Sequence, residues 1–566
     1  MINLAEKDIF REIQLYKIEG EKGNHLAQYI LGTIYEKTDK KQEAIKCYLS
    51  AASNDNVFAQ YKLSRMYFKG EGINQNYIEA LRWCNNSAIK GYAPAENFLG
   101  IMYKNGYGVE ENLVEAVKWY KKSAEQGYVY SQYNLGVVYE LGEGIEKDYQ
   151  LAANWYIKAA EQGYDKAENS LGDLYLKGNG VPRDYKEAFS WYKKSAEQGN
   201  SQAQLNLCYM YENGYYVEQN YENAAIWCIK SAEQGNVDAQ NKLGDLYKNG
   251  TGVDKDYKKA VEWYKKAAEQ GHSDAENNLG IMYQFGYGVD KNYSEAVEWY
   301  KKAALQQNLD GENNLANMYK NGYGVEQNLL EAIKWYKKAA EGGNINSQFH
   351  LGYIYSTGKG IKENYSEAIK WYKKAADAGH ANAQNNLGNM YKNGYGVEEN
   401  ILEAIKWYKK AAKQQYSNAQ NALGQIYEDG IGVPQDYNEA IKWYKEAANN
   451  GNANSQYQLG CLYINGEGVK RNYEEALKWT KKAAENGHAS GQFQLGYMYA
   501  NGNGTEKNYD EAIKWFTKAA EQNLIEAQFN LGCIYEAGEF IEKDFEQAAY
   551  WYKKAAKQGY ITMKNK

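Results

Sequence analysis

Apolar and polar positions repeat along this chain with a period of 36 residues. All fourteen tryptophans occupy one column of that repeat. Within each repeat the apolar residues form two stripes with helical spacing, such as Ala383, Leu387 and Met390, followed by a second stripe over 404–412. A period of this length predicts stacked supersecondary units, each of which buries its apolar face only against its neighbours.

One unit, residues 380–415, shows how each repeat is built. The first stripe ends before the segment 393–397 (Asn-Gly-Tyr-Gly-Val), whose two glycines favour a tight loop. Asn400 then follows as the N-cap of a second helix, with Glu403 placed three residues later as in a capping box. Asn or Asp occupies this cap position in all fourteen long units. The pattern therefore predicts a helix, a glycine loop and a second helix in every repeat.

The repeat divides the chain into four segments. We expect residues 1–23 to form one helix that caps the open end of the stack. Residues 24–55 form a short unit, whose loop between the helices is four residues shorter than in the others. Residues 56–559 contain fourteen units of 36 residues, and residues 560–566 form a C-terminal tail.

Small residues indicate how closely the helices approach each other. The residue after the repeated leucine is Gly, Ser64, Cys208 or Ala316, and one column of the second helix is alanine in all fifteen units. A small residue on each helix lets two backbones approach to about 8 Å. We expect the tryptophans to fill the spaces between neighbouring helix pairs. The tryptophans given this structural role include Trp83, Trp119, Trp155, Trp299 and Trp551.

Composition and charge narrow the classes of protein. The 566 residues are 44% hydrophobic and 24% charged, which suffices for a folded core. The net charge of −6 argues against a nucleic-acid partner, which requires a basic surface. The N-terminus is too charged for a secretory signal, and no apolar run is long enough for a membrane span. We therefore expect a cytoplasmic protein without membrane insertion, and non-classical secretion stays open.

The six cysteines show no CxxC pair and no framework that repeats from unit to unit, which favours a reducing compartment. Cys208 takes the small position opposite Ala224, and Cys228 lies one helical turn beyond Ala224. We therefore expect Cys208 and Cys228 to be neighbours. A pair of free thiols is the favoured interpretation, and a disulfide is the alternative.

The repeated motif is Leu-Gly, a tyrosine four residues after the leucine, a Gly-x-Gly-Val loop and Glu-Ala-x-x-Trp-Tyr-x-x-Ala-Ala. It resembles the Sel1-like repeat, the longer-looped relative of the tetratricopeptide repeat, which the unit 24–55 resembles instead. The resemblance covers essentially the whole chain. It implies an all-α, right-handed superhelical α-solenoid of antiparallel helix pairs, with the first helices along the concave face. It also implies a scaffold or adaptor that binds proteins or peptides in that groove.

Two columns of the first helix change most in character from unit to unit. They lie two residues before and two residues after the leucine, so they share one helix face. Asparagine offers a donor and an acceptor that can bind an extended peptide backbone, and tyrosine offers anchoring area. A solvated polar face is the alternative. The expected partner-binding residues are Asn241, Asn277, Asn313, Asn385, Asn421, Tyr133, Tyr209, Tyr353 and Tyr497.

No set of residues is arranged for catalysis, for a cofactor or for a metal. The Gly-x-Gly loops follow helices rather than strands, so they are not a dinucleotide fingerprint. His272, His380 and His488 occupy one column three units apart. At about 10 Å per stacked layer that spacing is too long for a shared metal, so we interpret them as turn residues. The repeated Lys-Lys pairs are interpreted as a solvated face.

The sequence therefore predicts a non-enzymatic scaffold whose partners are proteins or peptides. One alternative is a β-lactamase-like hydrolase, as in the cysteine-rich branch of the family, but the chain lacks the paired cysteines of that branch. Another is a bacterial effector that binds a host protein. The last unit shows no polar cap after residue 558, so we expect Tyr552 to be partly exposed. End-to-end self-association through the C-terminal repeat is one consequence to test.

Overall fold

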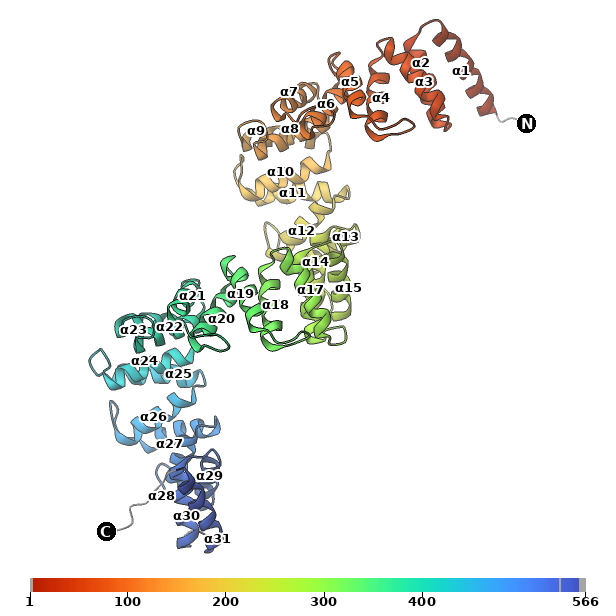
Figure 1. Cartoon of the computed structure of the whole chain (residues 1–566). Coiled ribbons are helices and arrows are strands. Elements are labelled where there is room, and N and C mark those ends of the chain that lie inside the picture. The colour runs from red at the N-terminus through yellow and green to blue at the C-terminus, as the bar shows by residue number, and fades with distance from the viewer. Residues whose placement is uncertain (1–3, 539–540, 559–566) are drawn as a thin grey trace. The chain divides into compact units, whose positions relative to one another are not determined.

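The structure is a computed structural model that describes residues 4–538 and 541–558, with side chains from residue 13 onward. Within these residues it contains 31 α-helices and no strand (Figure 1). The chain divides into two compact units, Met1–Lys291 and Asn292–Lys566. In each unit first and second helices of successive repeats alternate, and helices adjacent in sequence pack against each other. The predicted all-α fold of stacked antiparallel helix pairs is confirmed.

The first helices carry the Leu-Gly motif and follow helix α1 (Leu4–Glu21). They are α2 (His25–Lys37), α4 (Val57–Lys69), α6 (Ala93–Asn105), α8 (Val129–Leu141), α10 (Asp165–Lys177), α12 (Ser201–Asn213), α14 (Val237–Asn249), α16 (Ser273–Phe285), α18 (Leu309–Asn321), α20 (Ile345–Thr357), α22 (Ala381–Asn393), α24 (Ser417–Asp429), α26 (Ala453–Asn465), α28 (Ala489–Asn501) and α30 (Ile525–Ala537).

The second helices carry the tryptophan column. They are α3 (Lys41–Ser53), α5 (Tyr77–Ala88), α7 (Leu113–Glu125), α9 (Tyr149–Glu161), α11 (Tyr185–Glu197), α13 (Tyr221–Glu233), α15 (Tyr257–Glu269), α17 (Tyr293–Leu305), α19 (Leu329–Glu341), α21 (Tyr365–Asp377), α23 (Ile401–Lys413), α25 (Tyr437–Asn449), α27 (Tyr473–Glu485), α29 (Tyr509–Glu521) and α31 (Phe545–Lys557).

The helix ends lie where the cap residues predict them. In α5 and every later second helix the Asn or Asp N-cap accepts a backbone N–H, as Asn400 does from Glu403 at 2.9 Å. The carboxylate of Glu403 pairs with Lys406 at 2.8 Å, where a capping box would have it return to the cap N–H. The first helix α22 ends at Gly394, which has a φ of 67° that glycine adopts without strain.

In most helix pairs the centre is a tyrosine of the second helix, which follows the tryptophan in the long units. Tyr156 is fully buried, and its ring lies against Gly136 of α8. The alanine column, represented here by Ala152, is also buried throughout. The prediction that small residues allow a close helix approach is therefore confirmed, and the small residue after the leucine accommodates an aromatic ring of the second helix.

Several tryptophans share buried clusters with residues of the preceding repeat. Trp371 is 3% exposed and belongs to a buried cluster that includes Ile333 and Tyr336 of the preceding repeat and Leu351 of its own first helix. Other members of the column are half-buried, and there a lysine covers the indole ring. Lys302 Nζ, for example, lies 3.7 Å from the ring centroid of Trp299. The second lysine of each pair therefore packs on tryptophan as well as facing solvent. Trp83, Trp119 and Trp551 are buried, whereas Trp155 and Trp299 are half-buried.

The last helix of the second unit leaves aromatic rings open. Phe545 and Tyr550 of α31 are exposed, and Tyr552 is half-buried, in agreement with the expected partial exposure of Tyr552. The tail 560–566 lies outside the described residues. Self-association through this end stays a prediction.

Candidate interaction surface

The open face of the first helices is marked by the column two residues after the leucine. Every residue of this column is exposed or half-buried. Three of its members are tyrosines: Tyr209, Tyr353 and Tyr497 are 38%, 46% and 40% exposed. Tyr133, from the column before the leucine, is half-buried and packs edge-on against Tyr164, with ring centroids 5.2 Å apart.

The asparagine column lies deeper than the tyrosines. Asn277, Asn313, Asn385 and Asn421 are only 7–9% exposed, and Asn241 is half-buried. The structure thus places these asparagines at the junctions between first helices, whereas the sequence pattern indicated a position on the open face. The physical reason is the hydrogen bond that a buried amide requires, which the next repeat provides.

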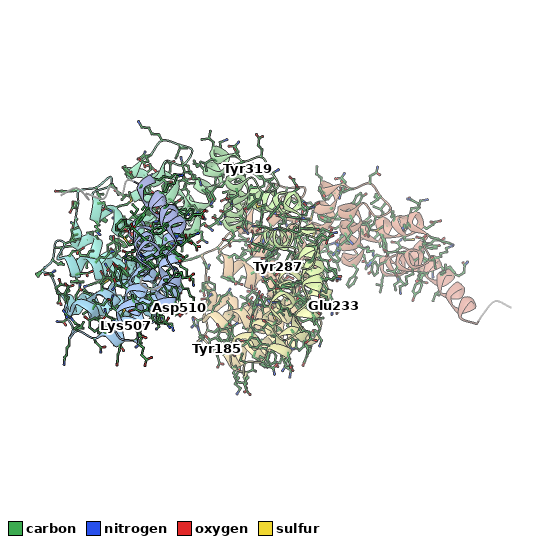
Figure 2. All side chains as sticks on the ribbon, turned by 90° about the horizontal axis from the view of Figure 1, so that it is seen from below. Tyr185, Glu233, Tyr287, Tyr319, Lys507 and Asp510 are labelled. Atoms are coloured by element: carbon green, nitrogen blue, oxygen red, sulfur yellow. The ribbon has the colours of Figure 1, made fainter. Side chains whose placement is uncertain are left out.

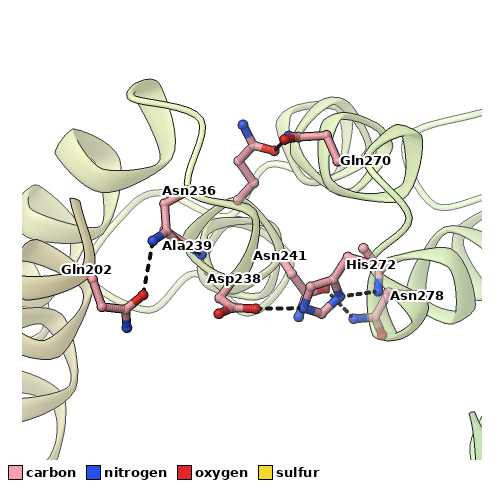
Figure 3. Close-up of polar contacts among 10 residues, drawn as sticks. Gln202, Asn236, Asp238, Ala239, Asn241, Gln270, His272 and Asn278 are labelled. Carbon is pink, nitrogen blue, oxygen red and sulfur yellow. Dashed lines mark hydrogen bonds and ion pairs between the residues drawn. The ribbon is translucent and has the colours of Figure 1, made fainter. Parts of the chain in front are cut away.

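These amide bonds run from one repeat to the next. Asn241 Oδ1 accepts from Asn278 Nδ2 at 3.1 Å (Figure 3). In the second unit Asn313 Oδ1 accepts from Ser347 Oγ at 2.9 Å, and Asn421 Oδ1 accepts from Ser455 Oγ at 2.7 Å. Asn385 differs, because its Nδ2 donates to the adjacent Asn386 at 3.4 Å. Asn241, Asn313 and Asn421 thus each join their first helix to the next one.

The histidines of the repeated column act as N-caps. His272 Nδ1 accepts the backbone N–H of Ala275 at 3.2 Å, and its Nε2 lies 3.2 Å from Asp238 (Figure 3). His380 and His488 accept backbone N–H groups in the same way. This agrees with their interpretation as turn residues. In the part of the chain that the structure describes, no three His, Cys, Asp or Glu side chains are grouped so that they could hold a metal ion.

In some repeats the hydroxyl of the central tyrosine donates to the open-face residue two positions after the leucine. Tyr264 donates to Asp245 at 2.6 Å, and Tyr408 donates to Asn389 at 2.6 Å, so a polar residue is useful in that column. Beneath Tyr497 the second helix instead carries Phe516, which has no hydroxyl to satisfy. The internal hydrogen bonds of this repeat therefore do not require a tyrosine at position 497.

The position beneath Tyr209 is occupied by a cysteine. Cys228 is buried, and a hydrogen bond with Cys208, together with burial, raises the pKa of the Cys228 thiol. Both are free thiols, so the prediction that Cys208 and Cys228 are neighbouring thiols is confirmed. Burial raises the pKa of Tyr209 above them to about 12, so its hydroxyl stays protonated at neutral pH.

Each of the three exposed tyrosines lines a cavity on this face. A cavity of about 400 Å³ between α12 and α14 includes Tyr209 and Asn241. One of about 270 Å³ near α18 and α20 includes Tyr353, and one of about 310 Å³ near α28 and α30 includes Tyr497. Cavities of this size accommodate single side chains of a partner. The exposed tyrosines and the cavities beside them thus form a candidate interaction surface in each unit. Tyr209 belongs to the surface of the first unit, and Tyr353 and Tyr497 belong to that of the second.

Stacked tyrosines on the loops were not predicted. Tyr185 lies parallel to Tyr215, and Tyr257 to Tyr287, each with ring centroids 5.0 Å apart; Tyr185 and Tyr287 are marked in Figure 2. The signal was present in the sequence, because a tyrosine at the start of a second helix recurs with a tyrosine thirty residues later in the glycine loop.

Comparison with known proteins identifies the family. The Sel1 repeat matches residues 25–56 and then fourteen successive segments of 36 residues, from 57–92 to 525–560. The chain is a Sel1 repeat protein. No helix in the described ranges has the length and hydrophobicity required to cross a membrane.

Two solved structures and one curated protein are similar to this Sel1 repeat protein. A protective antigen from uropathogenic Escherichia coli is 34% identical, with a TM-score of 0.60, over 84% of this chain and 94% of the antigen. A Sel1 repeat protein from Oxalobacter formigenes is 35% identical, with a TM-score of 0.40, over 43% of this chain and 96% of that protein. DAP3-binding cell death enhancer 1 of Rattus norvegicus is 33% identical over 99 residues, which are 17% of this chain and 19% of that protein. The chain thus spans about a fifth of the length of the rat protein.

Proposed function

We propose that this Sel1 repeat protein is a non-enzymatic scaffold that binds protein or peptide partners on the open face of its first helices. The observation that supports the proposal is the coincidence of exposed tyrosines with cavities: Tyr209, Tyr353 and Tyr497 each stand at the rim of one. Rigid aromatic anchors beside side-chain-sized pockets are typical of binding energy concentrated in a few residues.

The asparagines take a different role in this proposal from the one their pattern suggested. Asn241, Asn277, Asn313, Asn385 and Asn421 are buried or half-buried. We assign the alignment of neighbouring first helices within each unit to Asn241, Asn313 and Asn421, which bond to the next repeat. Tyr133 adds a half-buried ring to the surface of the first unit, which also contains Tyr209. Within each unit, several weak contacts along one partner segment then add up to useful affinity.

A triple substitution tests the proposal. Tyr209→Ala, Tyr353→Ala and Tyr497→Ala are combined, and the partners retained by the full-length parent protein are identified by affinity purification and mass spectrometry. The affinity of each purified partner is then measured against both proteins. We expect the triple variant to bind at least about tenfold more weakly, because each lost anchor costs about 1 kcal/mol or more.

The matched control removes three tyrosines from the loops. Tyr287→Ala, Tyr323→Ala and Tyr395→Ala alter residues that are about as exposed, at 40%, 44% and 49%, but lie in the glycine loops. The control is expected to bind like the parent. Equal weakening by both triple variants, or by neither, would refute the assignment of binding to the first-helix face.

The same measurements distinguish the alternatives. A hydrolase of the β-lactamase type would turn over nitrocefin, and nothing among the described residues supports such an activity. An exported effector would use the same face toward a host protein, and an export assay separates that case from a scaffold inside the producing cell. Self-association through α31 predicts an apparent mass that rises with concentration in light scattering.

A further inference from the structure

The cavity beside Tyr353 differs chemically from the others on the interaction surface. It lies within the second unit, between the end of α18, the start of α19 and the middle of α20. Its lining includes two cations, Lys320 and Lys359, together with His350. Its apolar wall consists of Leu329, Ile354 and the ring of Tyr353.

The sequence explains why there is space here. In the preceding repeat Tyr293 stacks on Tyr323, and in the following repeat Tyr365 stacks on Tyr395, with ring centroids 5.0 and 5.3 Å apart. The equivalent pair in this repeat is Leu329 and Lys359. Two large flat rings are thus replaced at the cavity by a smaller apolar side chain and a flexible cation.

The two lysines occupy positions that hold an ion pair elsewhere in the chain. Lys104 and Glu143 are 39 residues apart and form a salt bridge. Lys320 and Lys359 have the same separation in sequence, so the acidic member of the pair is replaced by a second cation. Among the described residues neither lysine has a carboxylate within 4.0 Å. Burial, and then the charge of Lys359, lowers the pKa of Lys320.

The donors in the cavity match a single carboxylate. Two ammonium groups can each bind one of its two oxygens. One amide hydrogen of Asn321 and one of Gln327 are already used, because these side chains donate to the carbonyls of Asn317 and Lys320 at 2.9 and 2.8 Å. The lining contains no arginine, the residue best suited to grip a phosphate bidentately. The apolar wall can pack against the methylene groups of a glutamate side chain.

We propose that the cavity between Lys320 and Lys359 binds the carboxylate of a glutamate side chain from an acidic segment of the partner. This proposal rests on the proposed function and adds the chemistry of one contact to it. The partner carboxylate takes the place that Glu143 holds beside Lys104. Tyr353 packs against the same segment at the rim of the cavity.

The test uses the full-length protein and a fluorescein-labelled octapeptide of alternating glutamate and alanine, followed by fluorescence anisotropy at low salt. Lys359→Glu restores the charge pattern of the Lys104–Glu143 pair. The new carboxylate is expected to pair with Lys320 and to take the place of the partner's carboxylate. We expect the peptide to bind the parent and to bind Lys359→Glu at least about tenfold more weakly. Lys373→Glu, on the exposed face of α21, makes the same change in net charge and is expected to bind like the parent.

Several results would overturn the proposal. They are absence of peptide binding to the parent, equal affinity of the parent and Lys359→Glu, and equal weakening by Lys373→Glu. Displacement of the peptide by inorganic phosphate at concentrations where acetate has no effect would instead assign the site to a free phosphate. A thermal midpoint of Lys359→Glu at or above that of the parent shows that lost binding is not lost folding. A partner that depends on the three tyrosines but not on Lys359 would leave the proposed function intact and refute this contact.

Discussion

Gly136 lies directly against the ring of Tyr156, so that a methyl group on Gly136 would stand 2.5 Å from Cδ1 of the tyrosine. In two repeats the chain changes both members of this pair together. Where the second-helix residue is Cys84 the small residue is Ser64, and where it is Cys228 the small residue is Cys208. In these two repeats a larger residue thus enters the first helix where the ring is absent, as close packing of complementary shapes favours, whereas Gly460 is kept opposite Thr480.

The first prediction tests this complementarity. Gly136→Cys is expected to destabilise the protein by about 1–3 kcal/mol, because the new side chain overpacks the ring of Tyr156. The cost is limited, since Ala316 is tolerated opposite Tyr336 in another repeat. Urea denaturation under reducing conditions measures the effect.

The control for this prediction is the double variant Gly136→Cys with Tyr156→Cys, which reproduces the pair Cys208 and Cys228. Tyr156→Cys alone should be costly, because it leaves a cavity beside glycine. The double variant should be more stable than the sum of the single costs implies, by about 1 kcal/mol or more. Strictly additive costs would show that the two positions do not share the space.

The fold could be predicted because each local signal recurs in most or all of the repeats. A cap such as Asn400 or a small residue such as Gly136 is a weak indication alone. Repeated down its own column, the cap predicts the helix boundaries and the small residue predicts the close approach of the two helices. The depth of each column on the first helix could not be predicted in this way. Asn313 and Tyr353 belong to neighbouring columns of one helix face, and only the packing of the next repeat decides that the first is buried and the second is open.

The second prediction concerns the tryptophans. Trp371→Ala should cost about 3–5 kcal/mol, because the buried indole bridges two repeats and its removal leaves a cavity. Trp299→Ala should cost less, about 1–3 kcal/mol, since Trp299 is half-buried under Lys302. Loss of the Trp371 contact should also uncouple the repeats on either side, so that thermal denaturation separates into two transitions. Equal costs for the two variants, or a single unchanged transition for Trp371→Ala, would contradict this account.

The third prediction concerns the turn between α23 and α24. Gln415 has a φ of 61°, in the left-handed region, where most other repeats have glycine. Gln415→Gly should raise the stability by up to about 1 kcal/mol, because glycine adopts a left-handed conformation without strain. The gain is limited, because glycine also increases the entropy of the unfolded chain, which lowers the stability. Gly379→Ala is the reverse control: its φ is 96° and no atom lies within 4 Å of an added methyl group, so only backbone strain can destabilise it. Opposite signs are expected in calorimetry, and equal signs would rule out backbone strain as the cause.

The fourth prediction uses pH. Burial, aided by the charges of Lys320 and His380, lowers the pKa of His350 from 6.5 to about 4. Between these values the unfolded chain binds a proton that the folded protein excludes, so the stability from this group is present above pH 6.5 and is lost as the pH falls toward 4. The full loss is at most about 3 kcal/mol.

His350→Asn removes this dependence. Asparagine occupies the same position in other first helices, as at Asn386, so the fold accommodates it. The stability of the parent relative to His350→Asn is expected to fall between pH 7 and pH 4.5, with a slope approaching 1.4 kcal/mol per pH unit. His25→Asn, at an exposed histidine, serves as the control in the same urea titrations. A difference between parent and His350→Asn that does not change with pH would mean that His350 takes up its proton equally well in the folded protein, and the cavity beside Lys320 would then be more open to solvent than its burial indicates.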